Sequence, residues 1–343
     1  MARKTKMNSI TSPELLSQVN PENKELLEEF LDYLRSTQRS EGTINGYEND
    51  INIAFVWGLQ HNNNLSFIDW KKRHIVKYQN WLLNENGNSS ARVRRLKASL
   101  SSMANFISNI LDEDYPNFKN IINKVESPVN QPAREPAIWS EEELQELLDK
   151  LTDKKQYEKA CYLALGIYSG RRKAELCRFK MSDFDEDRLV CGGALYKSAP
   201  IKTKGRGGGK FIPCYTLAKG FKPYLDNWIK ERELHHIESE WLFPKPDCSD
   251  GKDEHIGIST ANSWARTFDR LSDKPYYHHM LRHAWTTNLY KAGIPESVIQ
   301  TLQQWATIDM VGVYNDCSAD EQIEMYFKDG EIVAPQKKGL NDL

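Results

Sequence analysis

An aperiodic stretch in the middle of the chain constrains its fold most, because it separates two different patterns. Residues 127–139 read SPVNQPAREPAIW, with three prolines and no helical spacing of apolar side chains. Proline lacks a backbone N–H and disfavours helix in the residue before it, so this stretch predicts a linker. A chain of 343 residues is long enough for two domains, each with its own core. The predicted organisation is a flexible N-terminus at 1–19, a first domain at 20–126, a linker at 127–138, a second domain at 139–330 and a tail at 331–343.

The first half of the chain carries apolar residues at helical spacing. In residues 22–37 they recur every three or four positions, which places them on one face of a helix. The same spacing recurs in residues 41–60, 68–83 and 89–111. Four helices with short polar connections favour a compact all-α module.

The second half opens with a helix signal and contains short strands. Ser140 followed by Glu143 predicts a capping box at a helix start. Glycines at 205 and 207–209 mark the tip of a hairpin. Helices are expected at 157–168, 216–233, 259–271, 279–292 and 295–304, and strands at 188–191, 194–202 and 210–214. The predicted fold class is mainly α with a small β-hairpin or sheet: a helical domain followed by a mixed α/β domain.

Charge is unevenly distributed, although the formal net charge is only −2. Residues 66–97 hold eight Lys or Arg against two Asp or Glu, and residues 197–210 hold five basic residues and no acidic one. Residues 20–50 hold three basic residues against eight acidic ones. A chain with segregated charge can present a basic groove despite a neutral total. The pattern therefore indicates nucleic-acid contact, with solvated helix faces as the alternative.

The sequence argues against several classes of protein and site. No apolar run approaches the ~18 residues of a membrane span, and the basic N-terminus lacks the apolar core of a secretory signal. Six scattered cysteines without C-x-x-C favour reduced thiols in the cytoplasm. The glycine-rich stretch 205–210 lacks the G-K-S/T ending of a phosphate loop, and the pairs His235–His236 and Cys248–His255 lack zinc-ligand spacing. We expect no metal, no cofactor and no membrane partner.

Two cations near the C-terminus precede a tryptophan and a tyrosine. His279 and Arg282 lie three residues apart, on one face of a predicted helix. Trp305 can donate through its indole N–H, and a phenol follows nine residues later at Tyr314. Together these groups can hold a phosphate and attack it.

The spacing H-x-x-R-(22)-W-(8)-Y resembles the C-terminal signature of the tyrosine recombinases, the phage integrase family. Upstream, residues 169–176 (SGRRKAEL) resemble the family's T-G-x-R-x-x-E-L, which implies that Arg172 is the first catalytic arginine and Glu175 its acidic neighbour. Between these elements, Lys202-Thr203 resembles the Lys-Thr pair of a β-hairpin that supplies a catalytic lysine. The resemblance covers about residues 20–330, and its three elements occur in the family's order.

The chain also departs from the family's pattern. Arg171 stands where Leu is frequent, and Gln303-Gln304 stand where Leu-Gly is usual. Trp305 stands where most relatives have His, which is the variant of the Cre-like, two-domain layout. These departures leave the set of catalytic residue types complete, but they alter the expected packing around it.

The resemblance implies transesterification of a DNA phosphodiester. The Tyr314 oxygen attacks phosphorus and forms a 3′-phosphotyrosine, and the departing 5′-oxygen takes a proton from Lys202. Arg172 and Arg282 clamp the nonbridging oxygens, because a guanidinium makes bidentate bonds to phosphate and stays charged. The bond energy stays in the intermediate, so neither ATP nor a metal is required.

The remaining roles follow from the same resemblance, and some alternatives stay open. His279 donates to a phosphate oxygen or assists deprotonation of the tyrosine. Lys204 rivals Lys202, because residues two apart in a strand face one side. Tyr326 is the alternative nucleophile, outside the motif. His283 completes H-x-L-R-H and is expected to act as structural support.

The implied function is that of a site-specific DNA recombinase or integrase of a phage, plasmid or other mobile element, acting on DNA in the bacterial cytoplasm. Its partners are double-stranded target sites and further copies of the chain, a dimer at each site and a tetramer in the synapse. The alternatives are a telomere resolvase, a type IB topoisomerase, or a non-catalytic DNA-binding protein of the same fold. The candidate DNA-binding residues are Arg92, Arg94, Arg95 and Lys97 in residues 89–111, and Lys204 and Arg206 in the hairpin.

Overall fold

The structure, a computed structural model, divides the chain into two compact units whose boundary falls between residues 135 and 136. It describes residues 10–129, 139–203, 209–246 and 252–326, and the backbone of 327–328 and 331–332. We call residues 10–129 the N-terminal unit and residues 139–332 the C-terminal unit. The boundary falls within residues 127–138, the segment that the sequence predicts to be a linker.

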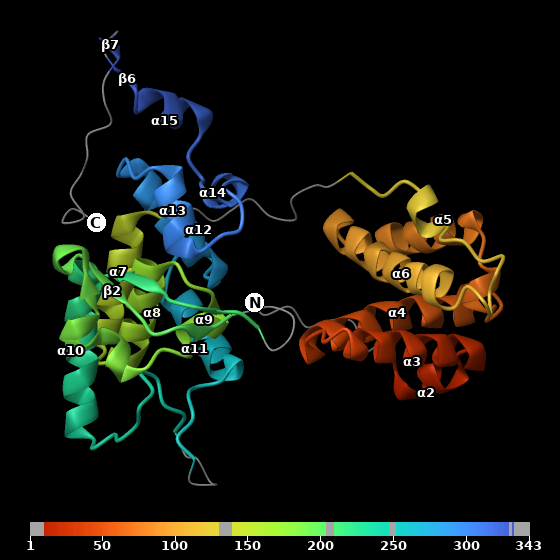
Figure 1. Ribbon diagram of the computed structural model, residues 1–343, viewed down its shortest axis with the longest axis horizontal. Helices are drawn as coiled ribbons and strands as arrows, with labels where there is room; N and C mark the ends of the chain where they lie inside the picture. The colour runs from red at the N-terminus through yellow and green to blue at the C-terminus, as the bar shows by residue number, and fades with distance from the viewer. Residues whose placement is uncertain (1–9, 130–138, 204–208, 247–251, 329–330, 333–343) are drawn as a thin grey trace. The chain divides into compact units, whose positions relative to one another are not determined.

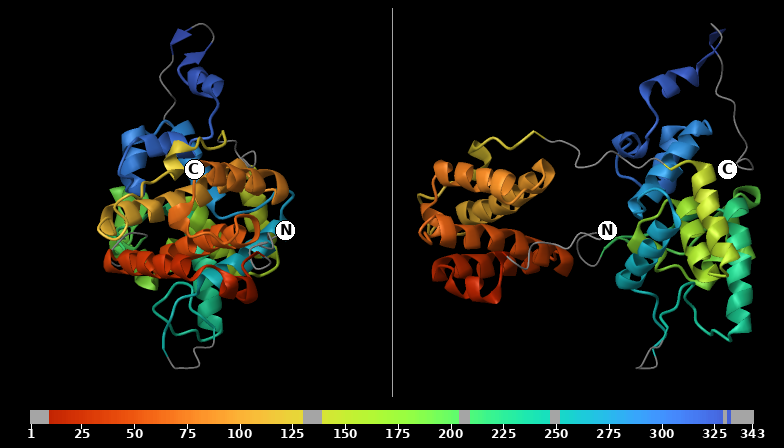
Figure 2. Two further views of the ribbon diagram at one scale, coloured as in Figure 1. Left: turned by 90° about the vertical axis from the view of Figure 1, so that its right-hand side faces the viewer. Right: turned by 180° about the vertical axis from the view of Figure 1, so that it is seen from behind.

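The N-terminal unit is all helical, as the apolar spacing predicts (Figure 1). Helices α3, α4 and α6 contact one another pairwise, and Figure 2 shows the same compact unit from two further sides. Aromatic rings fill the space between them: Phe30 lies 5.5 Å from Tyr47 and 5.6 Å from Phe106, between ring centroids. The elements are α2 (Pro13–Gln18), α3 (Pro21–Ser36), α4 (Glu41–His61), α5 (Lys72–Asn80), a π-helical turn (Trp81–Glu85) and α6 (Ser90–Ile110).

One part of the predicted flexible N-terminus is ordered. Pro13–Gln18 form α2, with proline at the first helical position and the Ser12 hydroxyl accepting from the backbone N–H of Leu15. Leu15 and Leu16 pack against the core of the unit. The prediction of flexibility for 1–19 is therefore wrong for these residues, because a cap and two leucines fix the short helix. Residues 1–9 lie outside the described part of the chain.

The C-terminal unit is built around α8, which contacts α7, α10 and α12 (Figure 1). Gly166 allows the close approach of α8 to α12, because a Cβ at that position would lie 2.5 Å from the Leu281 side chain. The α-helices described in this unit are α7 (Glu141–Asp153), α8 (Tyr157–Ser169), α9 (Lys173–Leu176), α10 (Ala218–Leu234), α11 (Ile258–Leu271), α12 (His279–Lys291), α13 (Glu296–Gln303), α14 (Asp309–Tyr314) and α15 (Ala319–Glu324). The bounds of α8, α10, α11, α12 and α13 lie within a few residues of the helices expected from the sequence, whereas α9, α14 and α15 lie outside those expected ranges.

The strands form small antiparallel sheets beside these helices. One sheet has the order β1-β2-β5, and β3 pairs with β4 separately. The predicted strand at 194–202 is split in two, because Pro200 has no N–H to offer a ladder. The strands are β1 (Leu189–Val190), β2 (Leu195–Lys197), β3 (Ile201–Lys202), β4 (Phe211–Ile212), β5 (Tyr215–Leu217), β6 (Phe327–Lys328) and β7 (Glu331–Ile332).

The capping box predicted at Ser140 occurs in the structure, and a second one occurs near the C-terminus. The Ser140 hydroxyl accepts from the N–H of Glu143, and the Glu143 carboxylate accepts from the N–H of Ser140. Ser318 and Glu321 form the same reciprocal pair at the start of α15. In the predicted tail, β7 pairs with β6, and residues 333–343 lie outside the described part of the chain. The predicted fold class, mainly α with small sheets, is confirmed.

Candidate active site

A tight turn after α8 positions residues 169–176, the segment that resembles the family's T-G-x-R-x-x-E-L. Gly170 ends α8 in the left-handed region, at φ 60°. A Cβ at this position would lie 2.6 Å from Gln303 Nε2 and 2.8 Å from the Trp285 ring, so only glycine fits. The Gly170 carbonyl accepts a hydrogen bond from Arg282 Nη1 (3.2 Å). The turn therefore joins the end of α8 directly to the arginine of α12.

Arg171 and Gln303, which differ from the family's usual residues, both form hydrogen bonds at this turn. The buried Arg171 guanidinium donates from Nη2 to the carbonyl of Leu302 (2.6 Å). The buried Gln303 amide donates from Nε2 to the carbonyl of Ser169 (2.9 Å). Arg171 and Gln303 thus tie the turn to the C-terminal end of α13, whose next residue, Gln304, adopts a left-handed φ of 54°. The unusual residues replace apolar packing with a polar link.

Arg172 and Glu175 form a pair at the start of α9. Glu175 Oε1 accepts from Arg172 Nη1 (3.2 Å), and Glu175 Oε2 accepts from the Arg172 backbone N–H (3.1 Å). The Glu175 side chain is only 2% exposed, whereas that of Arg172 is 42% exposed. One edge of the guanidinium is therefore held and the rest faces solvent, as a phosphate-binding arginine requires.

Tyr314 lies at the centre of an aromatic and cationic cluster. Its hydroxyl is 3.2 Å from His279 Nε2, and its ring stacks on Trp305 with the centroids 5.1 Å apart and the planes 9° apart. The Arg282 guanidinium lies 5.1 Å from the Tyr314 ring centroid and 4.8 Å from that of Trp305. Four residues that are separate in sequence thus come together on α12, α14 and the segment between α13 and α14.

The cluster contains hydrogen-bond donors that the described part of the chain leaves unused. Arg282 is 1% exposed, yet its Nε and Nη2 have no partner there. The indole Nε1 of Trp305 is buried and equally unpaired. A buried donor without an acceptor costs roughly 1–3 kcal/mol, and three of them beside one tyrosine are available to a ligand. An anion with several oxygens is the ligand that would satisfy them.

The electrostatics of the site suit proton transfer at neutral pH. Burial, and then the charge of Arg172, lowers the pKa of Arg282 to about 10, so Arg282 remains charged at pH 7. Partial desolvation, and then His283 and the two arginines, lowers the pKa of His279 below its usual value. His279 is therefore neutral at pH 7, and an unprotonated Nε2 can accept the phenolic proton of Tyr314.

Lys202 is positioned by a residue that sequence reasoning did not find. It lies exposed on β3, opposite Phe211 of β4, and its carbonyl accepts from Arg178 Nη1 (2.7 Å). Arg178 follows α9 by two residues, so it connects the lysine strand to the helix of Arg172 and Glu175. In the described residues no hydrogen bond joins the Lys202 ammonium to the Tyr314 cluster. The alternative Lys204 and the candidate Arg206 lie outside the described part of the chain.

Tyr326 and His283, the alternative nucleophile and the expected structural support, lie in different surroundings. Tyr326, the alternative nucleophile, is 43% exposed and follows α15, away from the contacts of Tyr314. His283 packs its ring 5.0 Å from that of Tyr314 and bonds to Asp316. Asp316 lies two residues past the motif, where the sequence offered no signal for its role.

In the N-terminal unit, the candidate DNA-binding residues of α6 differ in their surroundings. The buried Asp50 carboxylate binds Arg92 (2.7 Å) and Arg95 (3.1 Å), and Arg94 is exposed and donates to the carbonyl of Pro128. Lys97, the fourth candidate of this helix, differs from the arginines. Its side chain is buried, and its ammonium donates to Gln79 and to the carbonyls of Val125 and Glu126, so it has no free donor for DNA.

Two further observations concern the described residues as a set. No three His, Cys, Asp or Glu side chains among them lie close enough together to hold a metal ion. None of the described helices combines the length and the apolar character needed to cross a membrane.

Comparison with known proteins gives a consistent result. Residues 138–321, more than half of the chain, match the model described as the phage integrase family. The chain is 27% identical over 277 residues to the SPbeta prophage-derived recombinase-like protein YomM of Bacillus subtilis (strain 168), covering 79% of this chain and 78% of YomM. It is 26% identical over 306 residues to the tyrosine recombinase XerA of Thermococcus kodakarensis, covering 87% and 93% of the two chains.

Solved structures resemble this fold over most of its length. The XerH site-specific recombinase bound to a palindromic difH substrate matches with a TM-score of 0.62 and 19% identity, over 93% of this chain and 91% of that chain. A lambda integrase dimer bound to a COC′ core site matches with a TM-score of 0.62 and 16% identity, over 85% and 77% of the two chains. At these identities the likeness shows the fold alone.

Proposed function

This chain belongs to the phage integrase family of tyrosine recombinases, enzymes of site-specific DNA recombination, and on that premise we propose that it cuts and rejoins double-stranded DNA through a covalent bond to Tyr314. One observation carries the proposal. The Tyr314 hydroxyl lies 3.2 Å from His279 Nε2, beside three buried donors, Nε and Nη2 of Arg282 and Nε1 of Trp305, that have no partner in the described residues. A nucleophile, a proton acceptor and donors for an anion therefore occur together.

The chemistry follows from these groups. The phenolic oxygen attacks the phosphorus while its proton passes to His279, and the P–O5′ bond breaks as the P–O(Tyr) bond forms. Lys202 gives its proton to the departing 5′-oxygen. Arg172, Arg282 and Trp305 stabilise the charge that develops on the nonbridging oxygens. Attack by a second 5′-hydroxyl reverses the step on a new partner, so neither ATP nor a metal takes part.

Contacts outside the site supply DNA affinity. In the N-terminal unit, Arg94 and Arg95 line a cavity of about 550 Å³ between α6 and residues 122–127. Arg95 is 62% exposed even while it is held by Asp50, so its position is fixed and its outer donors face solvent. We keep Arg92, Arg94 and Arg95 as DNA-backbone contacts and leave out Lys97, whose ammonium already has three acceptors.

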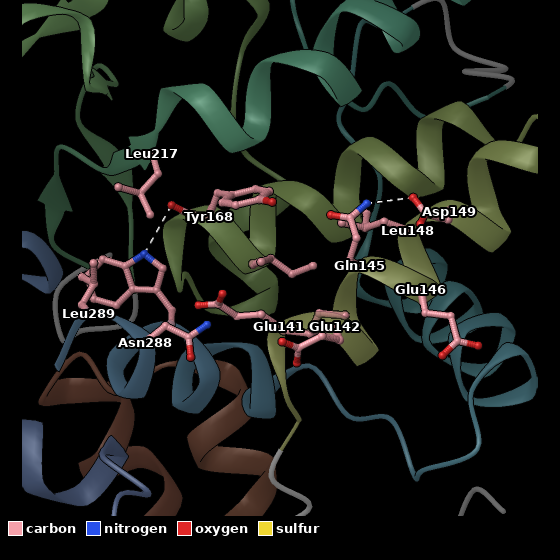
Figure 3. A pocket seen from close by; sticks show the side chains of 13 residues that line it. Glu141, Glu142, Gln145, Glu146, Leu148, Asp149, Tyr168, Leu217, Asn288 and Leu289 are labelled. Carbon is pink, nitrogen blue, oxygen red and sulfur yellow. Dashed lines mark hydrogen bonds between the residues drawn. The ribbon is translucent and has the colours of Figure 1, made fainter. Parts of the chain in front are cut away.

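Assembly into a dimer on each site and a tetramer in the synapse is supported by exposed apolar side chains in the segment 318–326 and by a cavity in the same unit. Helix α15 buries none of its residues, and its Ile323 and the following Tyr326 are 55% and 43% exposed. A cavity of about 510 Å³ lies between α7, α8, β5 and α12. Figure 3 shows it with Leu217 and Leu289 at one end and with Glu146 and Asp149 at the other. The apolar end of the cavity suits Ile323 and Tyr326 of another copy.

The nucleophile is tested by trapping the covalent intermediate. A nicked duplex from the DNA that flanks the gene loses a short fragment after cleavage, which prevents religation and leaves the protein attached. We expect Tyr314→Phe to abolish the adduct and to keep DNA binding, because the phenolic oxygen is the only atom removed. Tyr326→Phe is the matched control and should form the adduct at the wild-type rate. An adduct with Tyr314→Phe that disappears with Tyr326→Phe would reassign the nucleophile.

The assembly proposal needs a separate test. A chain that ends after Ser318 keeps the whole site and lacks α15. We expect it to bind a single site normally and to fail in joining two sites. Normal two-site complexes from the truncated chain would leave α15 without a role in assembly.

A further inference from the structure

We propose that Asp316 is a positioning residue for the nucleophile: together with His283 and Thr287 it fastens the segment that follows Tyr314 to α12. This inference rests on the proposed function of Tyr314 and names residues that the transesterification chemistry itself does not use. We call the three residues the α12 latch.

The first contact of the α12 latch is between two side chains. Asp316 Oδ1 lies 3.1 Å from His283 Nδ1, and the two side chains are only 14% and 23% exposed. Partial burial of both groups makes this contact worth more than a surface ion pair, because water competes less for either partner. His283 is the residue after Arg282, so the contact is made from the helix that carries the anion site.

The second contact is made by the backbone at the same position. The Asp316 N–H donates to Thr287 Oγ1 (3.0 Å), and Thr287 is buried one helical turn after His283. The same hydroxyl lies 3.5 Å from the Tyr314 carbonyl. Side chain and backbone of Asp316 therefore bind two successive turns of α12, and this fixes both the position and the direction of the chain that leaves the nucleophile.

The α12 latch also sets the surroundings of the tyrosine ring. The His283 ring lies 5.0 Å from the Tyr314 ring and 5.8 Å from the His279 ring, between centroids. Asp316 holds the His283 ring in place, and the His283 ring therefore limits how far the Tyr314 ring can turn away from His279. Helix α14 has only six residues and buries Val311 beside Tyr314, so the α12 latch adds to the restraint that the packing of this short helix supplies.

A restraint of this kind acts on the rate of attack and leaves DNA affinity alone. Displacing a reacting group by about 1 Å can cost on the order of 100-fold in rate. DNA affinity depends on phosphate contacts elsewhere, and neither Asp316 nor Thr287 offers a free donor to DNA, because both are engaged in the contacts above.

The test compares Asp316→Ala with two other variants of the full chain. Asp316→Asn keeps an acceptor oxygen for His283, and Asp187→Ala removes the same charge from an exposed position elsewhere in the same unit. Rates of adduct formation on the nicked duplex are measured in single turnover, together with DNA affinity and melting temperature. We expect Asp316→Ala to be slower by about 10- to 100-fold with unchanged DNA affinity. Asp316→Asn should recover most of the rate, and Asp187→Ala should equal wild type.

A second pair of variants probes the backbone contact. Thr287→Val removes the hydroxyl that accepts from Asp316, and Thr287→Ser keeps it. We expect the valine variant to lose adduct rate and the serine variant to retain it, at equal DNA affinity. The α12 latch would be overturned by wild-type rates in Asp316→Ala, or by rate, affinity and melting temperature falling together in every variant at 316 and 287. Absence of any adduct with wild-type protein would instead overturn the proposed function.

Discussion

Two buried cations, one in each unit, are satisfied in opposite ways. In the N-terminal unit, the Lys97 ammonium gives all three of its protons to acceptors of the chain, at 2.8–3.1 Å. In the C-terminal unit, the buried Arg282 has one acceptor, the Gly170 carbonyl, and leaves Nε and Nη2 unpaired among the described residues. The bonds of Lys97 are accounted for by the fold itself, whereas the unpaired donors of Arg282, beside Tyr314, fit the anion that we propose binds there.

The buried carboxylates show the same difference. Asp50 binds Arg92 and Arg95 and also accepts from a serine hydroxyl, so its charge is fully used within the N-terminal unit. Glu175 holds one edge of Arg172 and that residue's backbone N–H, and it leaves the guanidinium 42% exposed. The first carboxylate closes a structural network, and the second orients a cation toward a ligand.

The largest effect is expected at Lys202, whose cation is exposed in the resting structure. Lys202→Ala should slow cleavage of a normal DNA strand by about 10²- to 10⁴-fold, the usual contribution of a general acid. A strand with a 5′-bridging sulfur should be cleaved almost normally, because a thiolate leaves without a proton. Lys197→Ala, on neighbouring β2, is the control. Equal defects on both substrates would remove this role from Lys202, and the same comparison with Lys204→Ala would show whether it holds the role.

Arg282→Met tests whether the unpaired donors of Arg282 serve the reaction. Loss of one charge-stabilising donor group should reduce single-turnover cleavage by about 10²- to 10³-fold. The melting temperature should stay equal or rise, because an uncompensated buried charge has been replaced by an apolar side chain. A marked loss of stability would show that Arg282 is held by the fold as Lys97 is.

Acid should destabilise the C-terminal unit through His278. Burial, and then the charge of Lys173, lowers the pKa of His278 to about 4, against 6.5 in the unfolded chain. Between these pH values the unfolded chain binds more protons, so stability rises with pH through this window and falls as the pH is lowered toward 4. The loss amounts to about 3 kcal/mol at 1.36 kcal/mol per pKa unit. Melting curves of wild type and His278→Gln should diverge as the pH falls below 6.5, and parallel curves would contradict the assignment.

The smallest effect is expected at Lys97. Lys97→Met keeps the length of the side chain and leaves the carbonyls of Val125 and Glu126 without their donor. Stability should fall by about 1–3 kcal/mol, and adduct formation at saturating DNA should be unchanged. Loss of DNA affinity in a variant that remains folded would restore Lys97 to the DNA-binding surface.

The sequence predicted those features that a local pattern encodes. Helical spacing and the cap at Ser140 predicted most of the longer helices. His279 and Arg282 were placed on one face because a single helix fixes their spacing. The approach of Tyr314 to them depends on packing between helices, and the sequence supported it only through the resemblance to a family.

The features that sequence reasoning missed depend on contacts between distant residues. Arg178 reaches Lys202 from another element, and Asp316 reaches His283 across 33 residues. Lys97 has the residue type of a surface cation, yet three acceptors from other segments draw it inward. No periodicity encodes such contacts, because each depends on where two elements meet.

The polar contacts of Arg171 and Gln303 have a consequence for how the turn after α8 tolerates substitution. Both residues bind around one turn, from positions more than 130 residues apart in the chain. Each side chain bonds a different backbone carbonyl, that of Leu302 or that of Ser169, so replacing either residue by the usual leucine removes one bond and leaves the other in place. The turn is therefore held twice, and a single replacement should be tolerated better than both together.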